Sequence, residues 1–150
     1  MSINLNRVFT YPYDKDLLMR KQKSIRRELL VRTDVDYIDK RIAVLCGSTV
    51  DDIKNILELF LLDVGIRPRF YQSEYNKFYE DAVFGNAELD EFQPDIIIVF
   101  TSMVNIIERP ALGDGYDEVK EKLRMEMGRF TRIWEIMSLS QVTEFLYFQF

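Results

Sequence analysis

A small polar turn follows the first apolar segment of the chain. Arg41–Cys46 is a short apolar run, Gly47-Ser48-Thr49 comes next, and an amphipathic segment begins at Asp51. A serine at a strand-to-helix turn can act as a nucleophile, and the backbone N–H groups of such a turn can bind an oxyanion or a phosphate. A plainer interpretation is that Thr49 or Asp51 only caps the helix. The sequence leaves these three roles open.

Two further polar groups follow the other apolar segments. Glu74, Tyr75 and Asn76 come after residues 67–72, and Thr101, Ser102 and Asn105 come after residues 94–100. In an open parallel sheet the carboxyl ends of the strands share one edge, so we expect these groups to meet. The predicted ligand-binding residues are Gly47, Ser48, Thr49, Glu74, Tyr75, Asn76, Thr101, Ser102 and Asn105, and Ser48 is the candidate catalytic residue.

Each candidate also has an ordinary structural interpretation. Glu74 is the nearby carboxylate that can act as a base, but an acidic residue at a helix start is commonly solvated. The Thr101-Ser102 pair and Asn105 can be turn or helix-start residues. Arg109, in the following loop, can attract an anion or simply face water.

The absence of histidine limits the chemistry. The sequence has no histidine and one cysteine, Cys46. A Ser-His-Asp triad cannot be assembled from this chain, nor can a histidine-containing zinc site, and no intramolecular disulfide is possible. Cys46 lies within an apolar run and is predicted to be a small core residue. We predict neither a metal site nor a cofactor.

Length and composition predict an ordinary folded domain. The chain has 150 residues, with 47% hydrophobic and 13% aromatic content, which suits one well-filled core. Twenty basic and 25 acidic residues give a net charge of −5, which argues against a general nucleic-acid binder. No apolar run approaches the ~20 residues of a membrane span. A single cysteine and the absence of a signal peptide favour the cytoplasm.

The hydrophobic pattern alternates between strands and helices. After an ordered amino-terminal arm, it predicts helices at 14–31, 51–64 and 117–140, short helices within 73–84 and 88–92, and strands at 41–46, 67–72, 94–100 and 142–150. This order is typical of a three-layer, doubly wound α/β fold with a mainly parallel sheet, of the SGNH-hydrolase or flavodoxin type. We predict an arm and basic helix over residues 1–40 and one compact α/β domain over residues 41–150.

The first predicted helix is strongly basic. Its polar faces carry Lys15, Arg20, Lys21, Lys23, Arg26 and Arg27. Such a stripe usually faces water, but it can also bind a nucleic acid or an acidic protein.

Several segments, in their order and spacing, resemble one protein family. They are the basic, leucine-containing first helix, the strand ending in Gly47-Ser48-Thr49, Glu58–Leu62 with Gly65-Ile66, Phe70–Asn76, Leu89 with Phe92 and Pro94-Asp95, and Thr101-Ser102 with Asn105-Ile106. This arrangement is similar to the amino-terminal domain of FkbH-like proteins, whose later domain is of the haloacid-dehalogenase class. The likeness runs from about Leu17 to Trp134.

The resemblance implies an SGNH-hydrolase-like fold. In that class a serine after the first strand is the nucleophile, glycine and asparagine groups bind the oxyanion, and a distal Asp-x-x-His supplies the base. Ser48 matches the serine and Asn105 lies near the asparagine position, whereas no segment matches Asp-x-x-His. The family's later domain uses an Asp-x-Asp nucleophile. Asp34-Val35-Asp36 has that spacing but no preceding strand, so we interpret it as a connector.

The resemblance also implies a function and partners. FkbH-like proteins load a glyceryl group from a phosphorylated glycerate onto an acyl carrier protein. The expected role is therefore an SGNH-like ligand-binding or accessory domain, with little turnover of its own and with a haloacid-dehalogenase-type domain and a carrier protein as partners. The alternatives are a small serine esterase or acyltransferase using Ser48, and a non-catalytic protein-interaction module.

Overall fold

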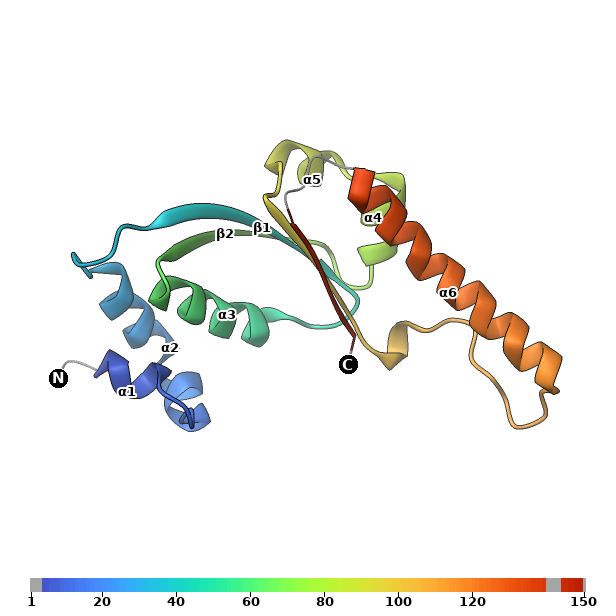
Figure 1. The fold of residues 1–150 in the computed structure, drawn as a ribbon, viewed down its shortest axis with the longest axis horizontal. Helices are drawn as coiled ribbons and strands as arrows, with labels where there is room; N and C mark the ends of the chain where they lie inside the picture. The colour runs from blue at the N-terminus through green and yellow to red at the C-terminus, as the bar shows by residue number, and fades with distance from the viewer. Residues whose placement is uncertain (1–3, 140–143, 150) are drawn as a thin grey trace. The chain divides into compact units, whose positions relative to one another are not determined.

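The structure is a computed structural model that describes residues 4–139 and the backbone of residues 144–149. Helices and strands alternate along most of the chain (Figure 1). The elements are α1 (Leu5–Phe9), α2 (Lys15–Leu30), β1 (Ile38–Cys46), α3 (Asp51–Asp63), β2 (Ile66–Gln72), α4 (Phe78–Phe84), α5 (Ala87–Phe92), β3 (Ile96–Thr101), the 3₁₀ turn η1 (Met103–Asn105), α6 (Tyr116–Leu139) and β4 (Glu144–Gln149).

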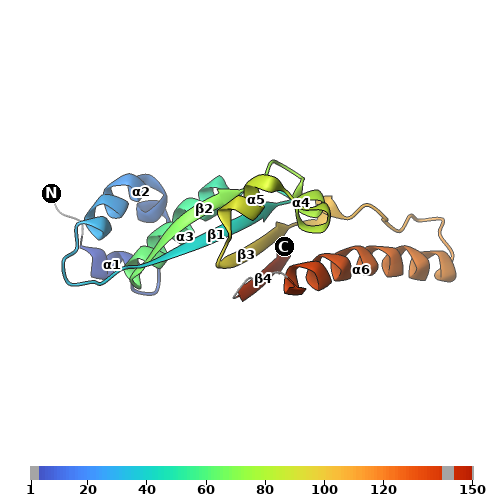
Figure 2. The same cartoon turned by 90° about the horizontal axis from the view of Figure 1, so that it is seen from above.

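The strands form one open sheet in the order β2-β1-β3-β4. β3 pairs in parallel with β1 and with β4, and Figure 2 shows these strands side by side. Val44 of β1 lies opposite Ile98 of β3, which sets the register. Residues 42–46 at the end of β1 and residues 97–99 of β3 are buried at successive positions, as parallel strands covered on both faces require. The prediction of an α/β fold with a parallel, doubly wound sheet is confirmed.

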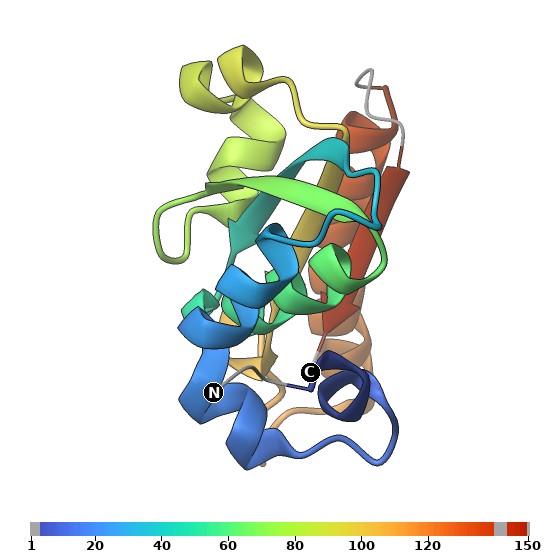
Figure 3. The same cartoon turned by 90° about the vertical axis from the view of Figure 1, so that its left-hand side faces the viewer.

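The chain divides into two compact units, of which the first comprises the residues up to Lys40 and Val50–Arg69. α2 and α3 lie beside each other in Figures 1 and 3, and with α1 they enclose a small apolar cluster. Its buried members are Val8, Leu18, Ile25, Leu29, Leu59 and Leu62. The Asp14 carboxylate caps α2 by accepting a hydrogen bond from the Leu17 N–H, and the predicted basic helix therefore begins where its sequence indicates.

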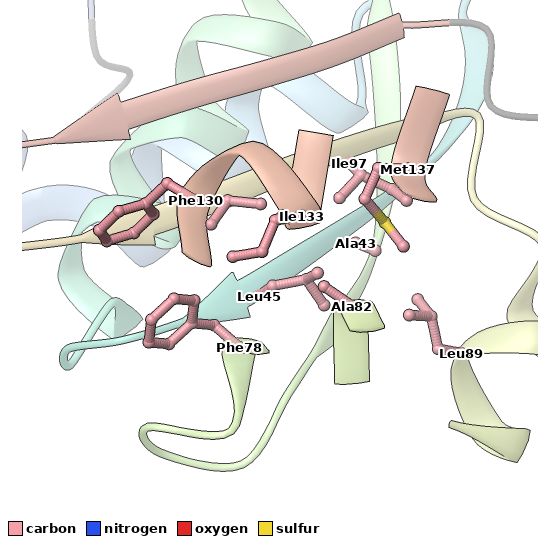
Figure 4. Packing of buried hydrophobic residues seen from close by; sticks show 10 residues of the cluster. Ala43, Leu45, Phe78, Ala82, Leu89, Ile97, Phe130, Ile133 and Met137 are labelled. Carbon is pink, nitrogen blue, oxygen red and sulfur yellow. The ribbon is translucent and has the colours of Figure 1, made fainter. Parts of the chain in front are cut away.

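The second unit comprises Arg41–Thr49 and Phe70–Phe150, and it contains the larger core. Side chains from β1 and β3 pack against α4, α5 and α6 (Figure 4). The cluster consists of Ala43, Leu45, Phe78, Ala82, Leu89, Ile97, Val99, Phe130, Ile133 and Met137. Trp134 is half-buried at the edge of this cluster. The burial of Cys46 confirms its prediction as a core residue.

Some elements differ from their prediction. The amino-terminal arm contains α1, which Asn4 caps. α3 starts after Val50, and no side chain caps it, so neither Thr49 nor Asp51 has that role. Helical periodicity predicts that Leu123 and Met127 of α6 share its apolar side with Phe130 and Ile133. Both are instead exposed, because only the carboxyl-terminal half of that helix packs on the core. The predicted positions Ser140, Val142 and Phe150 lie outside the described residues. Among the described helices, none has the length and apolar character needed to cross a membrane.

Candidate functional site

The ends of β1 and β3 meet at one edge of the sheet. The Gly47 N–H donates a 2.7 Å hydrogen bond to the Phe100 carbonyl oxygen, which extends the β1–β3 ladder past Cys46. One residue further on, the Ser48 and Ser102 hydroxyl oxygens lie 2.9 Å apart, and either can be the donor. Both serines are half-buried. The structure thus brings together two hydroxyl groups that lie 54 residues apart in the chain.

Asn105 fixes the geometry around these hydroxyls. Its Nδ2 donates to the Gly47 carbonyl oxygen over 2.6 Å and to Asn76 Oδ1 over 2.9 Å. Its Oδ1 accepts a 2.8 Å hydrogen bond from the Ser102 N–H. Both amide hydrogens of this buried side chain are therefore engaged within the protein, and Asn105 acts as a link between three segments. We name Gly47, Ser48, Asn76, Ser102 and Asn105 the strand-edge cluster.

Two backbone features make this close packing possible. A Cβ atom on Gly47 would lie 2.6 Å from Asn105 Oδ1, so only glycine fits beside the asparagine amide. Asn76 has φ 62°, in the left-handed region that asparagine tolerates better than most residues. Its N–H donates to the Cys46 carbonyl oxygen over 2.9 Å, which holds the turn after β2 against the end of β1.

Ser73 is a structural residue beside the cluster. Its buried hydroxyl accepts a 2.7 Å hydrogen bond from the Cys46 N–H, while its own N–H donates to the Val44 carbonyl oxygen. At the point where the strand pairing ends, the Ser73 hydroxyl therefore takes the place of a backbone carbonyl as the hydrogen-bond acceptor.

The remaining predicted site residues are Thr49, Glu74, Tyr75 and Thr101. The side chains of Thr49 and Tyr75 are exposed, and Thr101 is fully buried at the end of β3. The Glu74 carboxylate is exposed and pairs with Lys77, which holds the pKa of Glu74 below its usual value. A lowered pKa makes this carboxylate a weaker base.

Arg109 binds the turn after β3. Its Nε donates to the Ile106 carbonyl oxygen, and its Nη2 donates to those of Met103 and Val104 at 3.0 and 2.9 Å. The guanidinium therefore satisfies the backbone carbonyl groups at the end of η1.

Sequence reasoning missed two charged residues on α6. Glu126 is 7% exposed, and Glu126 Oε1 accepts hydrogen bonds from the N–H groups of Ile107 and Glu108. Arg129 pairs with that carboxylate and donates to the Asn105 carbonyl oxygen over 3.0 Å. A signal was present in the sequence, because Glu126 lies four and seven residues before the core residues Phe130 and Ile133. A charge on the buried stripe of a helix indicates a fixed partner.

The arrangement can hold a polar ligand more readily than it can activate a nucleophile. A serine hydroxyl is a weak nucleophile until a neighbouring base takes its proton. Here the described hydrogen-bond partner of the Ser48 hydroxyl is another hydroxyl, that of Ser102. Among the side chains that the structure describes, no group of three or more cysteine, aspartate or glutamate residues lies close enough to hold a metal ion.

Comparisons with known proteins give one structural likeness. No model of a protein family matches the chain, and no curated protein matches it. The fold is similar to a crystal structure of the N-terminal part of the protein BF1531 from Bacteroides fragilis, which contains a phosphatase domain and was complexed with Mg. The TM-score is 0.60 at 17% sequence identity, over 84% of this chain. The chain covers 33% of that chain, so the likeness concerns the fold of one part of a longer protein.

Proposed function

We propose that this chain is a ligand-binding accessory domain of an FkbH-like protein and that the strand-edge cluster binds a small polar ligand. The observation that carries the proposal is the 2.9 Å pairing of the Ser48 and Ser102 hydroxyls at the carboxyl ends of two adjacent parallel strands. Ligands of open α/β sheets bind outside this edge. Each hydroxyl can donate and accept a hydrogen bond, which suits a ligand with hydroxyl, carboxylate or phosphate oxygens.

Binding has more support than hydrolysis. The sequence has no histidine, and the carboxylate of Glu74 points into solvent and is paired with Lys77. The amide of Asn105 already donates both hydrogens inside the protein, so it has none left for an oxyanion. These three facts weaken the alternative of a serine esterase or acyltransferase that uses Ser48.

The proposed partner is a catalytic domain of the haloacid-dehalogenase class. The sequence resemblance to FkbH-like proteins and the fold likeness to part of a phosphatase-domain protein both support this assignment. In this proposal the catalytic domain performs the chemistry, which is the transfer of a glyceryl or related acyl group to a carrier protein. The strand-edge cluster then contributes to binding the donor or its product.

A test of ligand binding uses three probes on the isotopically labelled 150-residue chain. Phosphorylated glycerate, glycerate and inorganic phosphate are titrated separately while amide chemical shifts are recorded. We expect phosphorylated glycerate to shift the signals of Ser48 and Ser102, and expect Ser48→Ala and Ser102→Ala each to weaken binding. Loss of one hydrogen bond to a charged ligand corresponds to about 1.5–3 kcal/mol, or roughly ten- to a hundredfold in affinity.

Ser138→Ala is the matched control, since Ser138 is an exposed serine on α6 whose hydroxyl bonds to the Trp134 carbonyl oxygen. Saturable shifts that persist unchanged in both cluster variants would contradict the proposed site. An ester substrate hydrolysed by the chain but not by Ser48→Ala would instead favour the esterase.

A second candidate function, docking of an acidic carrier protein, rests on α2. Arg20, Lys23 and Arg27 are exposed and recur at intervals of three and four residues, so they share one side of the helix. Leu18, Ile25 and Leu29 on the opposite side are buried. This basic side is available for a negatively charged surface, and we propose an acyl carrier protein as the occupant.

The carrier interaction can be tested by charge reversal. We expect Lys23→Glu with Arg27→Glu to weaken binding of an acyl carrier protein, and expect the interaction to weaken as salt rises, because exposed charges are screened within about 10 Å at 0.1 M salt. Lys120→Glu on α6 is the control, as that lysine is exposed but outside the basic side of α2. Equal affinity for the double variant and the control would count against this candidate.

A further inference from the structure

The turn after β3 is held from two directions. On one side the Asn105 amide bonds to Gly47 and Asn76, which belong to the turns after β1 and β2. On the other side the backbone of residues 105–108 bonds to α6. Ser102, whose hydroxyl pairs with Ser48, lies at the start of this same turn. The turn and α6 can be followed in Figure 1.

An ion pair between the buried Glu126 and the half-buried Arg129 makes the contacts on the α6 side. Glu126 Oε1 lies 3.0 Å from the Ile107 nitrogen and 3.1 Å from the Glu108 nitrogen, and both N–H groups donate to it. Arg129 Nη1 donates to both Glu126 carboxylate oxygens, at 3.2 and 3.1 Å, and to the Asn105 carbonyl oxygen. The carboxylate and the guanidinium thus form hydrogen bonds with three backbone groups of one turn, which are the two N–H groups and the Asn105 carbonyl.

The aromatic surroundings fix the arginine. The Arg129 guanidinium carbon lies 5.5, 5.3 and 5.5 Å from the ring centroids of Phe78, Tyr79 and Phe130. A cation over aromatic faces is attracted to them, and a planar guanidinium among three rings has little freedom to turn. The pair is therefore a rigid support and differs from the exposed i,i+3 pairs elsewhere on α6, such as Glu121 with Arg124.

We propose that Glu126 and Arg129 are positioning residues for the strand-edge cluster, acting through the backbone of residues 105–108 and the Asn105 amide on the Ser48–Ser102 hydroxyl pair. Neither residue contacts a ligand in this proposal. The positioning itself is independent of the proposed function, and only its effect on ligand binding rests on that function. A buried charge is costly unless it is paired and hydrogen-bonded, and this pair meets that requirement by binding the turn.

The experiment compares backbone hydrogen exchange and side-chain amide signals in the full chain and in Glu126→Ala, Glu126→Gln and Glu121→Ala. We expect Glu126→Ala to speed exchange of the Ile107 and Glu108 amides at least tenfold, which corresponds to about 1.4 kcal/mol of local stability. Exchange of the Ser102 amide should accelerate with them, and the side-chain NH₂ signals of Asn105 should shift. The Gly47 amide, bonded to Phe100, should keep its rate.

The conservative variant and the control separate positioning from general destabilisation. A glutamine at position 126 can still accept the two N–H groups but cannot form an ion pair with Arg129, so we expect intermediate effects at the same amides. Glu121→Ala removes an exposed glutamate with the same i,i+3 arginine spacing and should leave all these signals unchanged. Should Glu126→Ala fail to fold, the comparison of Glu126→Gln with Glu121→Ala decides the question.

Fast exchange at Ile107 and Glu108 with unchanged Ser102 and Asn105 signals would overturn the proposal, because the ion pair would then support only its own loop. Binding of phosphorylated glycerate is measured on the same samples. Absence of binding in the unmodified chain would refute the proposed ligand but leave the positioning result intact, so the two failures are distinguishable.

Discussion

The side-chain amide of Asn105 contacts the backbone of Gly47 so closely that no side chain fits at position 47. Nδ2 lies 2.6 Å from the Gly47 carbonyl oxygen, and a Cβ on residue 47 would lie 2.6, 2.8 and 2.9 Å from Oδ1, Cγ and Nδ2 of the Asn105 amide. Asn105 cannot move aside without losing its bonds to Ser102 and Asn76. The end of β1 and the turn after β3 are therefore locked together at this point.

Gly47→Ala is expected to destabilise the protein. The added methyl group must displace an amide held by three hydrogen bonds, and overpacking of this kind typically costs about 1–3 kcal/mol. Urea denaturation followed by circular dichroism gives the free energy of unfolding. Gly128→Ala is the matched control, because nothing lies within 4 Å of a Cβ there and Gly128 is inside α6. That control should stabilise the protein by up to about 1 kcal/mol through helix propensity. Equal effects of the two changes would show that the Gly47–Asn105 contact is not tight.

Asn105→Ala is expected to cost at least about 2 kcal/mol, since a buried polar group without a partner costs roughly 1–3 kcal/mol. The change removes the partners of the Ser102 N–H and the Gly47 carbonyl oxygen together. Asn55→Ala, at an exposed asparagine on α3, should change the free energy of unfolding by less than about 0.5 kcal/mol. A loss no larger than that of Asn55→Ala would mean that water replaces the Asn105 bonds without cost.

Acid should break the hydrogen bonds that Asp114 makes in the loop before α6. Asp114 Oδ2 accepts hydrogen bonds from Lys122 Nζ and from the Ala111 N–H, both at 2.7 Å, and the lysine together with that N–H lowers the pKa of Asp114. A lowered pKa in the folded state means that the stabilisation is complete above the ordinary value of about 4 and is lost as pH falls through the lower, folded-state pKa. We expect the chemical shift and the hydrogen-exchange rate of the Ala111 backbone amide to change only in that acidic range.

Asp114→Asn should remove this pH dependence, whereas Asp117→Asn, at an exposed position in the first turn of α6, should keep it. An Ala111 signal that titrates identically in the original chain and in Asp114→Asn would assign the transition to another group.

One tyrosine should ionise late. Burial, with a smaller contribution from the negative charge of Asp81, raises the pKa of Tyr71 to about 12. Because the folded-state pKa lies above the ordinary value of about 10, its contribution to stability is complete below pH 10 and is lost as pH rises through 12. The phenolate absorbance of the folded chain should therefore rise in a late step that Tyr71→Phe abolishes. The late ionisation of Tyr71 would be contradicted if all eight tyrosines gave their full phenolate absorbance near pH 10 while the circular dichroism spectrum remained that of the folded chain.

The class of fold was predictable because its signals are local. The apolar run from Ile96 to Phe100 can be buried on both faces only within a parallel sheet, and that is where β3 lies. Gly65 ends the region of α3 with φ +83°, as a glycine after a helix commonly does. These features depend on neighbouring residues and on helix or strand periodicity, both of which one sequence contains.

The details of the site depend on contacts between distant segments, which the sequence does not specify. Asn105 was predicted near a ligand from its position after a strand, but the bonds that engage its amide come from Gly47 and Asn76. Glu74 is exposed because of the path that the chain takes after β2, and its pairing with Lys77 is a local contact three residues along the chain. The apolar stripe of α6 was extended to Leu123 and Met127 because periodicity does not reveal where the core ends.

The half-buried Trp134 gives the second compact unit an intrinsic optical probe. It is the single tryptophan of the chain and packs at the edge of the core formed by β1, β3, α4, α5 and α6. Its emission spectrum therefore reports the melting of that core alone, while far-ultraviolet dichroism also reports α1, α2 and α3. Superposition of the two unfolding curves would establish that both units unfold cooperatively, and their separation would give each unit its own transition midpoint without labels.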